Sequence, residues 1–281
     1  FVGHGGAWHT GSKESRRPVC EALAQKGYVA VSTSYQLSSV SNEQIGTALT
    51  AVTIVLLSLA LTCPTVSQML VMLMLSLLIL TFFSILWLFW PREEVQHPAH
   101  ILDVARNFKW VTENVESLGG DPQKIVVMGH SAGGHLASLL ATNTSYLSQV
   151  GVDPSFVKAC VSISGAYSDQ RLKETQLGTQ ILHNAFGQRP HYYDAFPIYN
   201  VSQETCPFLL INAGVDLTLK RHSFDFHYAL RQAGVYVKTV YFDQETHWTI
   251  MRDWTDQNRA VIETIEAFLE ERWKQLKSAT S

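Results

Sequence analysis

Residues 125–140 read IVVMGHSAGGHLASLL, and this stretch decides the fold. The four apolar residues at 125–128 complete a strand expected at 124–128, the pattern Gly-x-Ser-x-Gly follows at 129–133, and an apolar helix-forming segment comes next. The glycines permit a tight turn that presents Ser131 at the N-terminus of that helix. There, the backbone N–H of Ala132 can face a negatively charged oxygen. The stretch therefore predicts a strand, a sharp turn and a helix, with Ser131 as a nucleophile.

Strand-like and helix-like segments alternate along the rest of the chain. Strands separated by helices are typical of a mostly parallel sheet with helices on both faces. A length of 281 residues is sufficient for one large α/β domain with a buried core. The expected strands are 28–32, 124–128, 157–163, 207–212 and 235–242, and the expected helices are 15–26, 99–118, 132–141, 221–232 and 258–274.

Two further residues complete a catalytic triad. A serine hydroxyl becomes a good nucleophile only when a base removes its proton, so a histidine and an orienting carboxylate are needed, in the chain order Ser, Asp, His. Asp216 follows the expected strand 207–212, and His247 follows the expected strand 235–242. The carboxyl ends of parallel strands are where such sheets collect their sites. We therefore predict Asp216 and His247 as partners of Ser131.

Alternatives exist for both partners. Asp216 also fits an N-cap of the helix that follows it, in which case Asp243 would be the reserve carboxylate. His222 and His227 fall on an expected helix and suit the role of the base less well than His247, whose own alternative is a surface loop histidine.

The chain begins with a second glycine-rich segment, in which residues 4–8 read HGGAW. Gly5 and Gly6 have no side chains, so their N–H groups can approach a substrate oxygen and form an oxyanion hole together with the N–H of Ala132. We expect His4 to brace this loop. We expect Trp8 to bind substrate by walling an aromatic pocket.

Several motifs agree with one family in their order along the chain. They are HGGAW at 4–8, Pro-Ala-His-Ile at 98–101 with Asp103, GGDP at 119–122 and GHSAGGHL at 129–136. Together they resemble the HGG-motif carboxylesterases of the α/β-hydrolase superfamily. This branch includes kynurenine formamidase, isoprenylcysteine methylesterase and feruloyl/acetyl xylan esterase-like proteins.

The resemblance covers residues 1–35 and 97–269 and implies an α/β-hydrolase fold that cleaves esters without a metal or organic cofactor. It also implies that Ser131, Asp216 and His247 form the triad, with Gly5, Gly6 and Ala132 as the oxyanion hole. The chain departs from this pattern because the family's opening strands are missing before Phe1, which is not a Met. We therefore expect a fragment in which strand 28–32 forms the sheet edge.

Two apolar runs interrupt the hydrolase pattern. Residues 45–62 and 69–90 contain no Asp, Glu, Lys, Arg or His. As helices they would span about 27 and about 33 Å, close to the hydrocarbon thickness of a bilayer, about 30 Å. Residues 63–68 contain Pro64 and separate the runs. We predict an inserted transmembrane hairpin at 45–92 that divides the hydrolase domain into 1–44 and 93–281. Two buried core helices are the alternative.

The hairpin follows from the chemistry as well as from hydropathy. Gly5 and Gly6 precede the insert while Ser131 and His247 follow it, yet all must meet at one reacting carbonyl. An odd number of crossings would separate them, so we expect residues 1–42 and 93–281 to share one compartment. The insert would cross twice or lie on one membrane surface without crossing. Membrane lipid is the expected partner. The expected location is a membrane, with an endomembrane as one candidate and the organelle left open.

Composition excludes other classes of function. The formal net charge is -3 and there is no long Lys/Arg run, so nucleic acid is not an expected partner. The four cysteines form no CxxC pair, which argues against a zinc site. No other metal site is expected.

The leading hypothesis is a membrane-tethered serine esterase that forms an acyl-enzyme on Ser131. Its small-molecule ester substrate would be lipophilic, for example a prenylcysteine methyl ester. An arylformamide is the alternative within the same chemistry. A non-catalytic, membrane-anchored binding protein on a hydrolase scaffold is the alternative from another class. The oligomeric state is left open.

Overall fold

The computed structural model describes residues 1–39, 70, 74, 77, 81, 95–252, 254–256 and 258–280. The chain divides into two compact units, Phe1–Leu37 with Val95–Ser281, and Ser38–Glu94. In the second unit Leu70, Met74, Leu77 and Thr81 are helical, and the remainder of the predicted hairpin lies outside the described residues. No helix within the described ranges is both long enough and apolar enough to cross a membrane.

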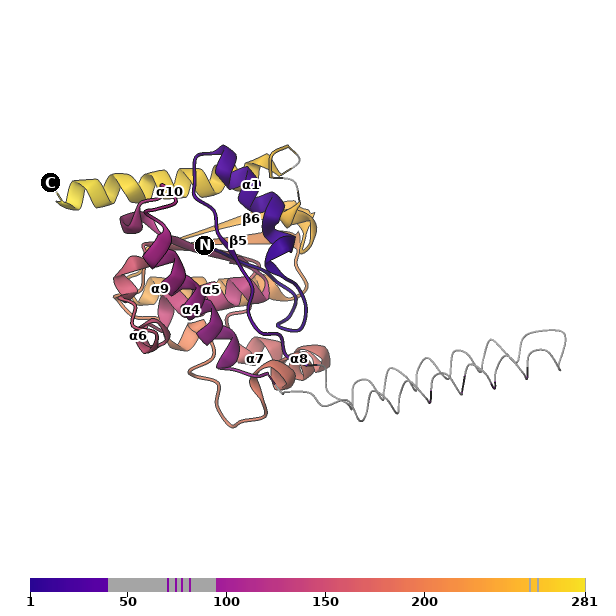
Figure 1. Ribbon diagram of the computed structural model, residues 1–281. Helices are drawn as coiled ribbons and strands as arrows, with labels where there is room; N and C mark the ends of the chain where they lie inside the picture. Colours follow the sequence, from indigo (N-terminus) through magenta and orange to yellow (C-terminus); the bar gives the residue numbers. More distant parts are fainter. Residues whose placement is uncertain are drawn as a thin grey trace. The chain divides into compact units, whose positions relative to one another are not determined.

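A parallel sheet forms the centre of the first unit (Figure 1). In the described residues its strand order is β2-β1-β3-β4-β5-β6, and every neighbouring pair is parallel. This confirms the mostly parallel sheet expected from the sequence. The strands are β1 (Val2–Gly3), β2 (Ser32–Thr33), β3 (Val126–His130), β4 (Ala159–Ile163), β5 (Phe208–Val215) and β6 (Val237–Thr246).

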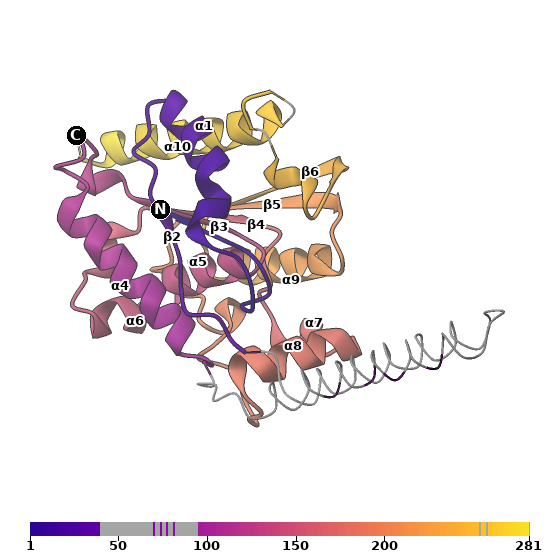
Figure 2. The ribbon, with the colours of Figure 1, turned by 45° about the vertical axis from the view of Figure 1, so that its right-hand side comes forward.

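Helices cover both faces of the sheet, as Figures 1 and 2 show. Helices α1 and α10 pack on one face through Leu23 and Phe268, while α4, α5 and α9 pack on the other, where Phe108 and Phe226 are fully buried. The helices are α1 (Arg17–Gln25), α4 (Ala99–Asn114), α5 (Ala132–Thr142), α6 (Ser145–Gln149), α7 (Asp169–Leu172), α8 (Gln176–Phe186), α9 (Leu219–Gln232) and α10 (Arg259–Thr280). Short 3₁₀ turns are η1 (Lys13–Arg16), η2 (Pro122–Lys124), η3 (Pro154–Phe156), η4 (Pro197–Tyr199) and η5 (Thr249–Met251).

The strand order changes direction at β1. The chain passes from β1 to β2 on one side and later returns to β3 on the other side, so β1 and β3 flank a topological switch point. Loops leaving the carboxyl ends of two such strands diverge and leave room for a ligand. The HGG loop leaves β1 at this point and the turn with Ser131 leaves β3.

Helix α5 packs on the sheet at backbone distance. A Cβ added at Gly129 would lie 2.1 Å from the carbonyl oxygen of Gly133, and one added at Gly133 would lie 2.6 Å from that of Gly3. Real side chains do not tolerate such distances. These glycines therefore allow α5 to begin directly against β1 and β3.

The strands differ from the expected ones mainly at their ends. β5 and β6 continue to Val215 and Thr246, which pair with each other, whereas we expected the strands to end at 212 and 242. β2 is shorter than the expected strand 28–32 and is one edge of the described sheet. β1 has only two residues, too few for a recognisable periodicity.

The backbone contact at Gly129 predicts a large cost for one methyl group. Gly129→Ala should lower the free energy of unfolding by about 3 kcal/mol or more, because neither partner in the clash is a flexible side chain. Gly151→Ala is the matched control, since Gly151 has φ 75° and nothing within 4 Å of an added Cβ. It should cost only the strain of a positive φ, about 1–2 kcal/mol. Urea denaturation measures both, and equal costs would contradict the packing described here.

Candidate active site

Ser131 sits in a strained turn between β3 and α5. Its φ of 56° and ψ of -121° lie in a region that residues with side chains rarely adopt. The turn is fixed by two backbone hydrogen bonds, from Ser131 N to Ile163 O at 2.8 Å and from His135 N to Ser131 O at 3.0 Å. The side chain is half-buried at the N-terminus of α5. This is the expected nucleophile geometry.

Asp216 and His247 meet in a buried contact. His247 Nδ1 lies 2.7 Å from Asp216 Oδ1, and both side chains are nearly inaccessible to solvent. The second carboxylate oxygen, Oδ2, accepts hydrogen bonds from Ser164 Oγ at 2.6 Å and from the N–H of Ala213 at 3.3 Å. Because both carboxylate oxygens are held, Asp216 can orient the ring of His247.

His130 links this pair to the turn that carries Ser131. Its Nε2 lies 2.8 Å from the carbonyl oxygen of His247, and the two rings are 4.6 Å apart. Burial lowers the pKa of His130 well below its usual range, so the ring is neutral and its Nε2–H donates to that carbonyl. Since His130 immediately precedes Ser131, this contact places His247 beside the nucleophile turn.

The HGG loop lies against the turn that carries Ser131. A Cβ added at Gly5 would be 3.0 Å from the Cβ of Ser131, and Gly6 has φ 120° with Thr10 O only 2.1 Å from an added Cβ. Gly6 therefore requires glycine, and a side chain at Gly5 would be in tight contact with the nucleophile turn. Within the described part of the chain, the N–H groups of Gly5 and Gly6 donate no hydrogen bond, which leaves them available to a bound oxygen.

His4 braces this loop, in the way expected from the sequence. Its Nδ1 lies 2.8 Å from Gly5 O, and its ring stacks on Tyr35 at 4.4 Å. The Tyr35 hydroxyl donates to His4 O at 3.1 Å. Burial lowers the pKa of His4, so the ring stays neutral and can donate to Gly5.

Trp8 is buried behind the HGG loop, and its expected role in forming a substrate pocket stays a prediction. The residue is 2% exposed, and its ring makes edge contacts with His135 at 5.0 Å and Phe186 at 4.9 Å. The loop turns its side chain inward because both Ala7 and Trp8 adopt positive φ. Trp8 therefore anchors the HGG loop to the core through these two ring contacts.

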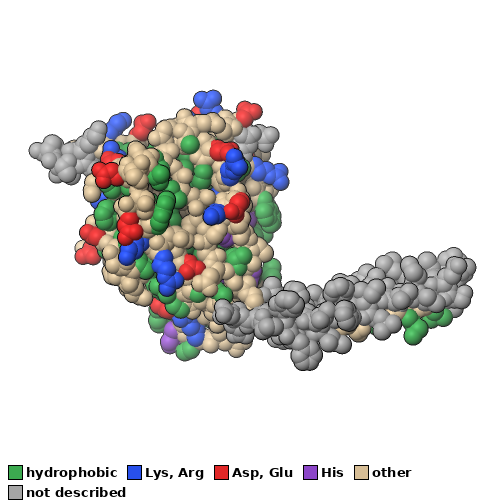
Figure 3. All heavy atoms as spheres, in the orientation of Figure 1, with side chains coloured by type: hydrophobic (Ala, Val, Ile, Leu, Met, Phe, Trp, Pro, Cys, Tyr) green, Lys and Arg blue, Asp and Glu red, His purple; other side chains and the backbone are tan. Residues whose placement is uncertain are grey.

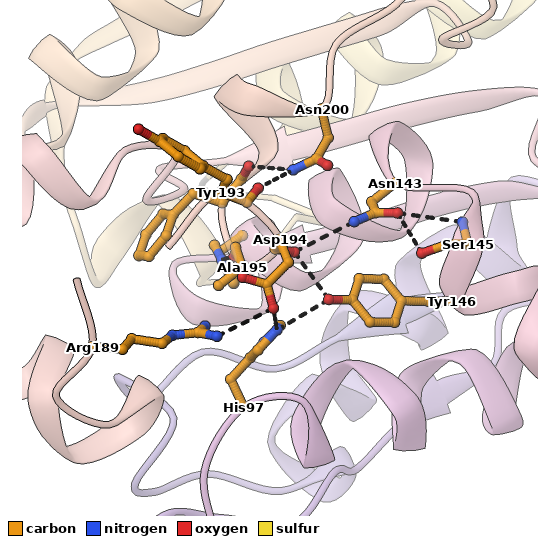
Figure 4. A network of polar contacts seen from close by, with 11 residues as sticks. His97, Asn143, Ser145, Tyr146, Arg189, Tyr193, Asp194, Ala195 and Asn200 are labelled. Carbon is orange, nitrogen blue, oxygen red and sulfur yellow. Dashed lines mark hydrogen bonds and ion pairs between the residues drawn. The ribbon is translucent and has the colours of Figure 1, made fainter. Parts of the chain in front are cut away.

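A polar network joins the start of α4 to the segment 187–200 beside this aromatic cluster (Figure 4). His97 Nε2 lies 3.2 Å from Asp194 Oδ2 and 3.0 Å from the hydroxyl of Tyr146, which donates to Asp194 O at 2.9 Å. Arg189 donates to the same carboxylate. Burial lowers the pKa of His97 to about 4, so it is neutral at pH 7. The network fixes the segment that holds His135 through Ala195 O.

The competing candidates lie elsewhere. Asp243 is exposed, and its backbone packs against Gly214. His222 Nδ1 accepts hydrogen bonds from the backbone of Tyr167 and Ser168, and His227 contacts Thr239 Oγ1 at 2.8 Å. The geometry therefore favours Asp216 and His247.

Sequence reasoning missed Ser164 and His130. Ser164 directly follows β4, the strand between β3 and β5, so its position at a carboxyl strand end was a usable signal. His130 is the variable residue of Gly-x-Ser-x-Gly, and the motif alone says nothing about its partner.

Within the described residues, no group of three or more His, Cys, Asp or Glu side chains is placed to hold a metal ion. Acidic and basic side chains are interspersed on the face shown in Figure 3.

A buried Asp–His pair beside a strained serine, at the switch point of a parallel sheet, is the arrangement of α/β-hydrolases. The BD-FAE family model matches residues 89–230, half of the chain, and the chain belongs to this family. The family and the fold implied by the sequence motifs are thereby confirmed.

Named relatives point in the same direction. The chain is 31% identical to esterase LipQ of Mycobacterium tuberculosis over an alignment of 186 residues that covers 61% of this chain and 44% of LipQ. It is 24% identical to the probable isoprenylcysteine alpha-carbonyl methylesterase ICME of Oryza sativa, over 52% of this chain and 39% of that protein. It therefore spans less than half the length of these curated relatives. An esterase of Pyrobaculum calidifontis shares the fold, with a TM-score of 0.64 and 22% identity over 96% of this chain and 75% of that one.

The contact between Asp216 and His247 predicts which carboxylate matters. Asp216→Asn should reduce kcat by on the order of 10⁴-fold, because an amide at this position stabilises the wrong tautomer of His247. Asp243→Asn, which changes an exposed carboxylate in the same way, should leave turnover unchanged. Ester hydrolysis by the two purified variants decides the matter. A reversed pattern would transfer the role to Asp243.

Proposed function

We propose that the chain is a carboxylic ester hydrolase that works through an acyl-enzyme on Ser131. The observation that carries this proposal is the 2.7 Å contact between Asp216 and His247, linked by His130 to the strained turn of Ser131. Support also comes from the family and from relatives named as esterases. A non-catalytic binding protein would have no need to maintain this strained and buried arrangement.

The proposed reaction uses only groups of this chain. Ser131 Oγ attacks the ester carbonyl carbon while His247 takes the hydroxyl proton and Asp216 stabilises the resulting imidazolium. The carbonyl oxygen becomes negative and accepts hydrogen bonds from the N–H groups of Gly5, Gly6 and Ala132. His247 then gives the proton to the departing alcohol as the C–O bond breaks. Water, activated by His247, hydrolyses the acyl-enzyme by the same steps in reverse order.

Loss of the Ser131 hydroxyl should separate catalysis from folding. Ser131→Ala should lower kcat by far more than about a hundredfold, as removal of a triad nucleophile does. It should also abolish labelling by a fluorophosphonate probe, which reacts only with an activated serine. Ser155→Ala, at an exposed serine, is the control and should keep both activities. Undiminished labelling of the Ser131 variant would refute the assignment.

The finer proposal is a lipophilic ester, with prenylcysteine methyl esters as one candidate. It is supported by the similarity to a protein named isoprenylcysteine methylesterase and by the apolar runs at 45–62 and 69–90. An arylformamide is the second candidate, because an amide and an ester pass through the same kind of tetrahedral intermediate.

We further propose that the apolar runs tether the enzyme to a membrane as a hairpin. The proposal is supported by their near-bilayer length and by the need for Gly5 and Ser131 to meet in one compartment. Protease protection in sealed vesicles, with epitope tags at both chain ends and in the 63–68 segment, tests it. We expect the two end tags to be both cleaved or both protected, and the tag in the 63–68 segment to show the opposite result. Opposite protection of the two ends would contradict the hairpin.

A further inference from the structure

Backbone strain in the described residues is concentrated around the proposed site. Positive φ is costly for any residue with a Cβ, and such strain persists mainly where function requires it. Each of these positions belongs to the HGG loop, the nucleophile turn or the surroundings of Asp216. The non-glycine residues concerned are Ala7 (50°), Trp8 (63°), Ser131 (56°), Ser164 (49°) and Leu217 (50°).

Leu217 is the one exposed member of this set, so packing in the interior does not explain its strain. Ser164 holds Asp216, and Trp8 packs inside the protein, but the side chain of Leu217 is 64% exposed. The turn itself is closed by a hydrogen bond from Leu219 N to Asp216 O at 2.8 Å, which any residue at 217 would allow. A glycine would adopt this conformation without strain. The leucine side chain therefore needs a reason of its own.

Two more exposed apolar side chains belong to residues next to Asp216 or His247 in the chain. Val215 is 69% exposed and pairs with Thr246, and its carbonyl accepts a hydrogen bond from His247 N at 2.9 Å. Trp248 is 64% exposed, and its ring makes an edge contact with the ring of His247 at 5.5 Å. Val215, Leu217 and Trp248, here called the apolar rim, thus flank the two residues that we propose handle the proton.

The reaction assigns a side of the substrate to this rim. His247 must give its proton to the oxygen of the departing alcohol, so that oxygen has to come within hydrogen-bonding reach of the ring, about 2.6–3.2 Å. Because Nδ1 faces Asp216, the proton passes through Nε2, and the carbon atoms attached to that oxygen begin at this end of the His247 ring. From there an extended alcohol can reach the exposed side chains next to His247 and Asp216 in the chain. The acyl group, bonded to the carbonyl carbon, is directed away from the departing alcohol.

We propose that the apolar rim binds the alcohol portion of the ester, and that the enzyme prefers esters of extended apolar alcohols. Contact with an apolar group removes Leu217 and Trp248 from water, which is a favourable use of otherwise exposed side chains. A methyl ester would leave the rim without a contact. This inference rests on the proposed function and places the apolar part of a lipophilic ester on the leaving side. It therefore argues against prenylcysteine methyl esters, whose departing alcohol is methanol.

Matched ester series test the inference. Hydrolysis of methyl, butyl and hexyl butyrate varies the alcohol, whereas methyl butyrate, hexanoate and octanoate vary the acyl group. For the unchanged chain, kcat/KM should rise with alcohol length. In Leu217→Gly and in Trp248→Ala, the ratio of kcat/KM for hexyl over methyl butyrate should fall about tenfold, as expected when an apolar contact is lost. Tyr228→Ala, at a 61% exposed aromatic on α9, is the control and should keep the ratio.

A second readout distinguishes substrate binding from a structural role. Leu217→Gly should raise the melting temperature, because it relieves strain at an exposed position, while it lowers the ratio. A lower melting temperature would contradict this account of the strain. Unchanged ratios in both rim variants, or a loss confined to the acyl series, would overturn the inference while Ser131-dependent hydrolysis continues. If the unchanged chain hydrolyses no ester and its serine is not labelled by a fluorophosphonate, the proposed function fails as well.

Discussion

The close packing of α5 on β1 and β3 is the constraint on which the site depends. Gly129 and Gly133 bring the backbone of the helix within contact distance of both strands, and no residue with a side chain fits there. The chain must therefore reverse within the single residue between strand and helix, which forces Ser131 to φ 56°. The packing therefore presents the Ser131 hydroxyl at the helix N-terminus. The stability of the core on both faces of the sheet offsets the backbone strain at Ser131.

The remaining site residues are placed by the same sheet. Strands β5 and β6 run beyond the length that their apolar patterns suggest, and pairing of Val215 with Thr246 brings Asp216 and His247 to the same height. Ser164, at the end of the neighbouring strand β4, donates a hydrogen bond to Asp216 Oδ2 and so holds the carboxylate in place. The pairing of parallel strands thus sets the distances between site residues that lie far apart in the chain. No local sequence pattern determines these distances.

Sequence patterns predicted the parts of the site that local chemistry determines. The strand, turn and helix around Ser131 could be recognised because glycine spacing and apolar runs are local features. The order of Asp216 and His247 followed from the expected strands. The burial of Trp8 could not be predicted, because it depends on packing against His135 and Phe186, which come from distant elements. The strand β1 and the helix α7 were missed because they are too short to show a periodicity. Helix α8 was missed although Leu182, Ala185 and Phe186 follow the cap residue Thr175 at helical spacing.

The central claim is that Ser131 carries the acyl group during turnover. The most direct measurement incubates the chain with an activated acetyl ester, stops the reaction in acid within the first turnovers, and locates the acetyl group by peptide mass spectrometry. The account predicts a mass increase of one acetyl group on Ser131, which disappears when the reaction is allowed to finish. Ester turnover with an acetyl group on another residue, or with no acetylated intermediate when deacylation is slowed, would contradict it.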